Sequence, residues 1–355
     1  MIKSLPHTFR ADTPKIMDQL RVEHWRGSVL ESYHEVHAVL VDHQGNVLAS
    51  SGNPNYITTA RSSLKPFQLL PTLAHGGRER FFLTLNDIAF MSSSHNGEPH
   101  HISQCTQLLE KIGSKIDDLL CGAHDPFHEE SIKVLACTGK KATALHNNCS
   151  GKHCSMLALR QILKSDGSYL DLNHPVQMAV IDCIESMLGY KRAWSWGIDG
   201  CSLPTPAVSL KELATLFAML ASGRSLHDER YDHHLSLIYE AMSSYPHLVG
   251  GTARFDSAFM KAAQGAAVCK VGGEGIRGFA IRDTEGQAYG VVVKVVDGAL
   301  RALHPACMEF LHRLELIDRP EPIDQPFSQL GEVDRFWRGV ELNAAGLEVT
   351  EIRIR

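Results

Sequence analysis

The sequence lacks the features that are typical of nucleic-acid-binding and membrane proteins. Its Lys and Arg residues form no long basic block, and a net charge of −5 favours neither DNA nor RNA as a partner. No run of about 18 or more apolar residues occurs, so we expect no membrane-spanning helix. The polar first residues contain no apolar signal-peptide core, and we expect a cytoplasmic protein without a nucleic-acid or membrane partner.

A disulfide framework is also missing. The nine cysteines are an odd number without a repeating spacing, which favours free or metal-bound thiols in a reducing compartment. The 20 histidines lie mostly in polar surroundings, and we expect pairs such as His100-His101 at the surface. With 44% hydrophobic and 21% charged residues, the 355-residue chain has an ordinary globular composition, and its length suggests about two domains.

Three short fragments follow one another in an order that points to amide chemistry. They are Ser62-Ser63-Leu64-Lys65, Ser94-His95-Asn96 and Lys270-Val271-Gly272. Read as S-x-x-K, S-x-N and K-x-G, they match the catalytic elements of β-lactamases and penicillin-binding proteins. Each fragment alone is a weak signal, and the order of the three carries the interpretation.

The spacing of Ser62 and Lys65 suits a nucleophile and its base. Residues three apart lie on one face of a helical turn, and we expect a helix over about 62–74. Pro66 must then lie near the helix start, because proline is tolerated only in the first turn. There, unpaired N–H groups can also stabilise an oxyanion. Alternatively, Ser62 only caps this helix and Lys65 is a solvated side chain.

Strand patterns at both ends of the chain enclose a helical middle. We expect strands over 22–31, 34–41 and 47–50 and, after Lys270, over 278–281 and 289–296. The helices that we expect cover 100–112, 152–164, 175–189, 209–223, 230–243 and 300–316. This order predicts an α+β fold rather than a doubly wound parallel one.

The same pattern predicts two lobes. Residues 1–65 and 255–355 would form an α/β sandwich lobe, with an antiparallel sheet built from both chain ends and flanked by helices. Residues 66–254 would form a mainly helical lobe. We expect the active site between the lobes, with Lys270 contributed by the first and Ser94 by the second.

The densest group of metal-ligating side chains runs from His146 to Cys154. Cys149 and Lys152 are three residues apart and can point to one side of a turn, and Cys201 could complete a three-ligand site. Zinc binds thiolates readily, but lysine is a rare ligand that must lose its proton, so chemistry alone would name His153 or His146 first. The alternative is a set of buried structural cysteines beside a helix start.

Six motifs together resemble the rhizobial-type, thermolabile L-asparaginase II family. They appear in the order of that family, at RSSLKPFQ (61–68), SSHNGE (93–98), the Cys149 cluster, GIDGC (197–201), GTARFD (251–256) and KVGGEG (270–275). The resemblance implies hydrolysis of L-asparagine to L-aspartate and ammonia. It also implies a serine β-lactamase/glutaminase-like fold and, commonly, a homodimer.

The resemblance also implies roles for individual residues. Ser62 and Lys65 would form one catalytic couple, and Ser94 and Lys270 the other. A zinc (Zn2+) site would lie at Cys149, Lys152 and Cys201, with Asp199 and His153 beside it, although the metal need not be the catalyst.

Asparagine also needs partners for its charged groups. Arg61 suits the α-carboxylate because its guanidinium can bind both oxygens, and Asp199 suits the α-ammonium. Both could instead be surface or fold-stabilising ions. Asn96 and His153 complete the residues that we assign to substrate binding.

Several alternatives stay open at this point. Either Ser62 or Ser94 could be the nucleophile, and the need for zinc is undecided. The same fragments are compatible with a serine glutaminase or a penicillin-recognising hydrolase. A non-catalytic sensor of a ligand or metal is a further alternative from a different class.

Overall fold

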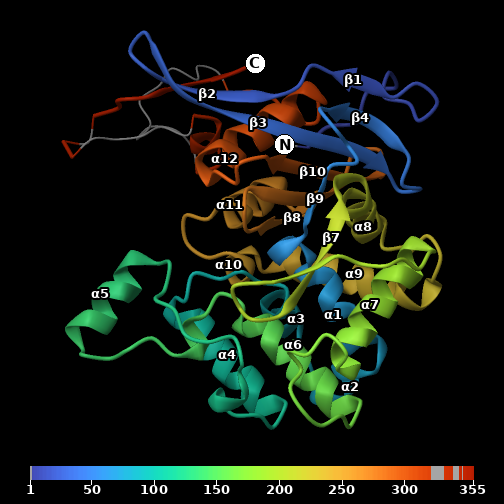
Figure 1. The fold of residues 1–355 in the computed structure, drawn as a ribbon, viewed down its shortest axis with the longest axis vertical. Coiled ribbons are helices and arrows are strands. Elements are labelled where there is room, and N and C mark those ends of the chain that lie inside the picture. The colour runs from blue at the N-terminus through green and yellow to red at the C-terminus, as the bar shows by residue number, and fades with distance from the viewer. Residues whose placement is uncertain (1, 321–331, 339–343, 346) are drawn as a thin grey trace. The chain divides into compact units, whose positions relative to one another are not determined.

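The computed structural model describes residues 2–320, 332–338, 344–345 and 347–355. Contacts divide the chain into two compact units, each drawn as part of the ribbon in Figure 1. The first unit comprises Met1–Thr58, Val208–Ser222 and Ala258–Arg355, and the second comprises Thr59–Ala207 and Gly223–Ser257. Residues 208–222, which the sequence pattern places in the helical lobe, are therefore part of the first unit.

The first unit is built on a mixed sheet of eight strands. Its main path runs β1-β4-β3-β10-β9-β8, and β2 pairs with both β3 and β11. The strands are β1 (Lys15–Met17), β2 (Arg21–Arg26), β3 (Val29–Asp42), β4 (Val47–Ser51), β8 (Ala267–Gly272), β9 (Ile276–Arg282), β10 (Ala288–Val295) and β11 (Glu351–Ile354). Among the described residues of this sheet, β1 and β4 pair in parallel and the other strand pairs are antiparallel. A sheet assembled from both ends of the chain confirms the predicted α+β class.

Two strand predictions need correction. The segment expected as one strand over 22–31 is a hairpin, because Gly27 adopts a left-handed φ of 58° and Arg26 pairs with Val29 across the turn. The strands predicted after Lys270 are present as β9 and β10, but Lys270 itself lies inside β8, a strand that was not predicted. Its backbone is therefore held within the sheet.

Helices cover both faces of this sheet. All eight residues of β10 are buried, and successive side chains of a strand point to opposite faces, so neither face of β10 is open to solvent. Helices α8 (Leu210–Ser222) and α12 (Leu300–Arg313) both contact β10. A capping box opens α8: Glu212 N–H donates to Ser209 Oγ at 3.1 Å, and Ser209 N–H donates to Glu212 Oε2 at 2.7 Å.

The second unit is mainly helical, as the helical periodicity predicts. Its helices are α1 (Lys65–Ala74), α2 (Gly77–Phe81), α3 (Leu85–Met91), α4 (Pro99–Lys111), α5 (Glu129–Cys137), α6 (Ser150–Ile162), α7 (Pro175–Leu188), α9 (Asp232–Ser244) and α10 (Pro246–Val249). Strand β6 (Trp196–Ile198) pairs antiparallel with β7 (Pro204–Ser209). The short strand β5 (Ile57–Thr59) leads into this unit, and α11 (Phe255–Ala263) leads out of it.

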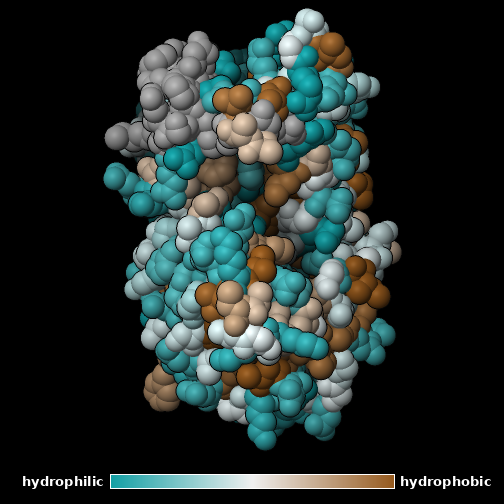
Figure 2. Space-filling view, turned by 90° about the vertical axis from the view of Figure 1, so that its left-hand side faces the viewer, coloured by the Kyte–Doolittle hydropathy of each residue, from teal (hydrophilic) through white to brown (hydrophobic). Residues whose placement is uncertain are grey.

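Several large apolar side chains of the described residues are exposed, among them Ile16, Phe82 and Ile198. The face drawn in Figure 2 is mostly hydrophilic, with apolar residues in separate groups. Among the described residues, no helix combines the length and the apolar character needed to cross a membrane.

Gly290 of β10 lets α8 approach the sheet closely. A Cβ built at this position would lie 1.8 Å from the backbone oxygen of Ala214 and 2.6 Å from the backbone nitrogen of Ala218. Backbone atoms of a packed helix cannot move aside as the end of a flexible side chain can.

We therefore expect Gly290→Ala to lower the free energy of unfolding by about 1–3 kcal/mol or more, because the substitution overpacks the core. The midpoint of chemical denaturation measures this change. Gly197→Ala is the matched control, because a Cβ there would meet Thr205 at an ordinary 3.6 Å. Equal midpoints for both variants would contradict the close approach of α8.

Candidate functional site

Lys65 is the buried centre of the candidate site. It opens α1, its side chain is 0% exposed, and its Nζ reaches three oxygen atoms. These are the Ser93 carbonyl at 2.6 Å, the Ser94 hydroxyl at 2.9 Å and the Asn148 carbonyl at 3.1 Å. Two separate segments of the second unit, before α4 and before α6, thus meet at one amine.

The three contacts suit either protonation state of the amine. Both carbonyls can only accept, so they take two N–H groups of Lys65. The Ser94 hydroxyl can accept a third N–H or, when the amine is neutral, donate to its lone pair. Burial lowers the pKa of Lys65 from its ordinary value, although attraction to Cys149 opposes that effect. Lys65 and Ser94 can therefore exchange a proton.

Ser62 lies in a single 3-10 turn, η1 (Arg61–Leu64), that precedes α1. The expected helix over 62–74 is thus divided at Lys65, with Pro66 in the first turn of the α-helical part. The Ser62 carbonyl accepts the Lys65 backbone N–H. Its hydroxyl is half-buried and makes no hydrogen bond to any residue that the structure describes. Lys65 thus forms its hydroxyl contact with Ser94 and not with Ser62.

Arg61 holds a strained backbone directly before Ser62. Its φ is 50°, in the left-handed region that costs a residue with a Cβ about 1–2 kcal/mol. Arg61 N–H donates to the Thr205 hydroxyl at 3.1 Å, and Arg61 Nε donates to Asp199 Oδ1 at 2.8 Å. The two residues assigned to the charged groups of asparagine therefore form an ion pair with each other. Asp199 is largely buried, and the charge of Lys152 and the bond from Arg61 lower the pKa of its carboxyl despite burial.

The side chain of Asn96 ties two loops together. Its Nδ2 donates to the Thr252 carbonyl at 2.9 Å and to Glu98 Oε1 at 3.3 Å. Glu98 in turn accepts the backbone N–H and the hydroxyl of Thr252, both at 2.7 Å. Asn96 is therefore engaged in holding the loop that carries Ser94.

His153 is fully buried on α6. Its Nδ1 lies 2.9 Å from the Tyr169 hydroxyl, and its Nε2 has no hydrogen-bond partner among the described residues. Burial lowers the pKa of this imidazole well below its usual range. His153 is thus a neutral ring with one ring nitrogen already in use.

Lys270 belongs to the first unit and is described there. It is fully buried in β8, and its Nζ donates to the Val271 carbonyl at 2.8 Å. Its assignment to a couple with Ser94 stays a prediction.

The predicted zinc ligands lie together in the second unit. Cys149 directly precedes α6, Lys152 is in the first turn of that helix, and Cys201 follows β6. All three are buried, and Lys152 Nζ donates to Cys201 Sγ at 3.0 Å. A hydrogen bond from Cys201, helped by the charges of Lys65 and Lys152, lowers the pKa of Cys149 well below its usual range. Burial lowers the pKa of Lys152, but the attraction of the two sulfur atoms outweighs it and raises that pKa.

These donors fit a metal site in composition. Two buried thiols and one buried amine converge, which is a donor set that zinc accepts. Lys152 is a ligand only after it loses its proton, so metal binding there competes with protonation of an amine whose pKa is raised.

A second group of possible ligands is less suited to a metal. Ligand atoms of Glu98, His100 and His101 lie within 4.8 Å of one another. His101, expected at the surface, is buried because it caps α4: its Nδ1 accepts the Glu98 N–H at 3.2 Å and its Nε2 pairs with the His247 carbonyl at 2.9 Å. Because both ring nitrogens of His101 already form hydrogen bonds, we assign Glu98, His100 and His101 a structural role rather than a metal-binding one.

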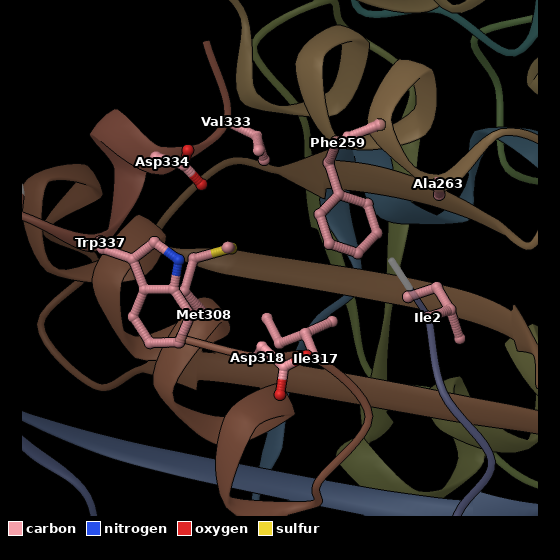
Figure 3. A pocket seen from close by; sticks show the side chains of 10 residues that line it. Ile2, Phe259, Ala263, Met308, Ile317, Asp318, Val333, Asp334 and Trp337 are labelled. Atoms are coloured by element: carbon pink, nitrogen blue, oxygen red, sulfur yellow. The ribbon is translucent and has the colours of Figure 1, made fainter. Parts of the chain in front are cut away.

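The cavity shown in Figure 3 lies in the first unit and has a volume of about 70 Å³. Its lining is mostly apolar, including Phe259, Met308 and Trp337, and its Asp318 is paired with Lys3. No nucleophile and base lie together among the residues that line it, so we assign it no catalytic role.

Sequence reasoning missed the backbone acceptors of Lys65. Carbonyl groups of Ser93 and Asn148 carry no residue-type signal, because every residue has a carbonyl. The only hint was that both belong to motifs already singled out.

Comparison with known proteins gives one family. The model of the L-asparaginase II family matches residues 22–354. A search of curated protein sequences gives no match.

Solved structures give only distant similarities. A protein named Mglu is 13% identical with a TM-score of 0.41, and the match covers 80% of this chain and 62% of that chain. A class A β-lactamase from Bacteroides cellulosilyticus is 14% identical (TM-score 0.41; 80% and 93% covered), and a Bacillus glutaminase is 13% identical (TM-score 0.37; 79% and 91% covered). The chain thus spans less than two thirds of the length of Mglu. We draw no functional argument from similarities at this level.

His101 makes stability depend on pH. Burial, with a smaller contribution from the charge of His100, lowers its pKa from 6.5 to about 4. Between these values the unfolded chain binds more protons than the folded one, so protonation favours unfolding. We expect the free energy of unfolding to fall by roughly 3 kcal/mol from this group alone as the pH falls from 6.5 to 4.

Denaturation midpoints measured across this pH range check the expectation. His101→Gln should give a flatter dependence than the parent protein, although its maximum stability is lower. His43 is exposed, and His43→Gln should leave the dependence unchanged. An unaltered slope in His101→Gln would show that another group titrates.

Proposed function

Because this chain belongs to the L-asparaginase II family, we propose that it hydrolyses the side-chain amide of L-asparagine to L-aspartate and ammonia. Membership of the family indicates an amidohydrolase. The observation that supports a serine–lysine mechanism is the buried Lys65 Nζ, which lies 2.9 Å from the Ser94 hydroxyl.

Burial is what makes Lys65 a suitable base. An ammonium loses its hydration when it is buried, and this favours the neutral amine that can accept a proton. A serine hydroxyl needs such a neighbouring base, because it is a weak nucleophile at neutral pH. The contact between Lys65 and Ser94 supplies a path for the proton.

We propose Ser62 as the nucleophile. Its hydroxyl is half-buried and free of hydrogen bonds to the described residues, whereas Ser94 is buried against Lys65. Ser62 Oγ would bond to the amide carbon and Lys65 would take its proton. The C–N bond would then break while Ser94 passes a proton to the departing ammonia. Water would hydrolyse the resulting ester, which returns the Ser62 hydroxyl and releases aspartate.

The Arg61–Asp199 pair supports recognition of an amino-acid substrate. An α-carboxylate beside the guanidinium and an α-ammonium beside the carboxylate would complement a pair that is already oriented by its 2.8 Å bond. Asn96 and His153 remain assigned to this subsite as predictions, and so do the homodimer, the cytoplasmic location and the role of Lys270.

A zinc ion fits Cys149, Lys152 and Cys201 in donor type. When bound, it would supply a positive charge that can polarise a carbonyl or a water molecule. Cys149 and Cys201 would hold it as thiolates, and Lys152 as a neutral amine.

The serine and lysine assignments lead to a kinetic prediction. We expect Ser62→Ala and Lys65→Met each to lower kcat for L-asparagine at least about a thousandfold, because a nucleophile and its base act as a unit. Lys65→Met should be inactive over the whole pH range rather than have a shifted optimum. Release of ammonia from L-asparagine, L-glutamine and a cephalosporin measures activity and substrate class together.

Ser94→Ala distinguishes the two serines. If Ser62 is the nucleophile, the Ser94 variant trapped with substrate should gain the mass of the acyl group, and peptide mapping should locate that group on Ser62. Near-normal turnover in Ser62→Ala would refute the assignment of the nucleophile. Faster turnover of L-glutamine or of a cephalosporin would show that L-asparagine is not the preferred substrate.

The metal assignment leads to a separate prediction. We expect the purified protein to contain about one zinc per chain, and Cys201→Ser to lose most of it, because zinc binds thiolate far better than a hydroxyl. Elemental analysis after dialysis measures the content. Cys137 is an exposed thiol outside the cluster, and Cys137→Ser should keep the metal. Full activity in protein verified as metal-free would show that zinc is not required.

A further inference from the structure

The loop that carries Ser94 lies between α3 and α4 and has no regular secondary structure. Every residue from Ser92 to Glu98 is buried, although the loop forms neither a helix nor a strand. Ser94 N–H donates to the Val249 carbonyl at 2.9 Å, and Asn96 ties the loop to Thr252. A buried loop needs such partners for its polar groups, and His95 supplies two more.

The hydrogen bonds of His95 fix its tautomer. Gly97 N–H lies 3.0 Å from His95 Nδ1, and a backbone N–H can only donate, so Nδ1 carries no proton. In the neutral ring the proton is then on Nε2, which donates to the Ser150 hydroxyl at 2.9 Å. The Ser150 hydroxyl, which accepts from His95, can in turn donate to the Leu145 carbonyl at 3.4 Å.

The surroundings of the ring favour its neutral form. His95 is 0% exposed and stacks against Phe90, at 5.0 Å between ring centroids, and against His101, at 4.9 Å. Burial lowers its pKa well below the usual range, and the neighbouring charges of His101, Lys65, His124 and His100 act in the same direction. A neutral ring keeps one donor and one acceptor at every pH near neutrality.

The bond from His95 to Ser150 joins the two segments that meet at Lys65. Ser93 and Ser94 precede and adjoin His95, while Asn148 lies two residues before Ser150. Lys65 needs oxygen atoms from both segments at once. We propose that His95 is a positioning residue, which holds the Ser94 hydroxyl and the Asn148 carbonyl at the separation that Lys65 requires; this inference rests on the proposed amidohydrolase function.

Three variants separate the two bonds of the ring. His95→Asn keeps an acceptor for the N–H two residues ahead, as in an Asx turn, and loses the bond to Ser150. Ser150→Ala loses the same bond from the other side. His95→Phe keeps a stacked ring and loses both bonds. Each variant therefore removes a known part of the connection.

We expect His95→Phe to lower kcat about 10- to 100-fold with KM changed less than about threefold, because a small misplacement of a catalytic group costs that much. His95→Asn and Ser150→Ala should show similar, smaller losses. Their combination should be no worse than either alone, because both remove one interaction. Additive losses would contradict a role through this bond.

His174 provides a matched control in the same unit. It is also buried, its Nδ1 accepts the N–H of Val176 two residues ahead at 3.2 Å, and its Nε2 pairs with the Asp166 carbonyl at 3.1 Å. His174→Phe should lower the melting temperature by a similar amount but leave kcat unchanged. Equal losses of kcat in His95→Phe and His174→Phe would overturn the positioning role.

A second measurement keeps this inference distinct from the proposed function. If the parent protein releases no ammonia from any of the three substrates, the proposed function fails, and hydrogen exchange then decides the role of His95. Amides of residues 93–97 should exchange faster in His95→Asn and Ser150→Ala, but not in His174→Asn. Unchanged exchange in both loop variants would overturn the inference, also where His95→Phe fails to fold.

Discussion

The second unit depends on the burial of one amine. Lys65 reaches Ser93, Ser94 and Asn148 only if two loops far apart in sequence are held at fixed positions. A buried amine without these oxygen atoms would cost several kcal/mol, so the loops and the lysine stabilise one another. Hydrogen bonds of Asn96 and His95 help to hold these loops in place.

The thiol and amine cluster is a second constraint on the same region. Cys149 directly follows Asn148, whose carbonyl accepts a hydrogen bond from Lys65. The same segment therefore contributes to the lysine site and to the group of possible metal ligands. The attraction between Lys152 and Cys149 raises the pKa of Lys152 and lowers that of Cys149. Chemistry at one of these groups is thus electrostatically coupled to chemistry at the other.

Local patterns in the sequence predicted local structure well. The three-residue spacing of Cys149 and Lys152, the capping box at Ser209 and the strand order at the two chain ends all follow from short-range rules. What failed is what depends on tertiary contacts. His101 looks like a surface residue in sequence but is buried as a helix cap. The left-handed φ of Arg61 was not predicted, because this conformation is expected of glycine and not of arginine. The pairing of Arg61 with Asp199 also joins two residues that the sequence treats as separate.

The order of strands in the first unit has a consequence for how this chain is made. Strands β2, β3 and β4 pair with one another early, but Leu40 also pairs with Val291 and Val22 with Ile354. The remaining neighbours of these strands therefore become available only after nearly the whole chain has been synthesised. Until then the edge of β3 that later pairs with β10 is open, and β3 lacks the helices α8 and α12 that later contact it. The second unit ends at Ser257, so all of its residues have been synthesised before those of β8, β9, β10 and β11. Expression conditions that shield such exposed strand edges should govern the yield of folded protein more strongly than those that protect the helices.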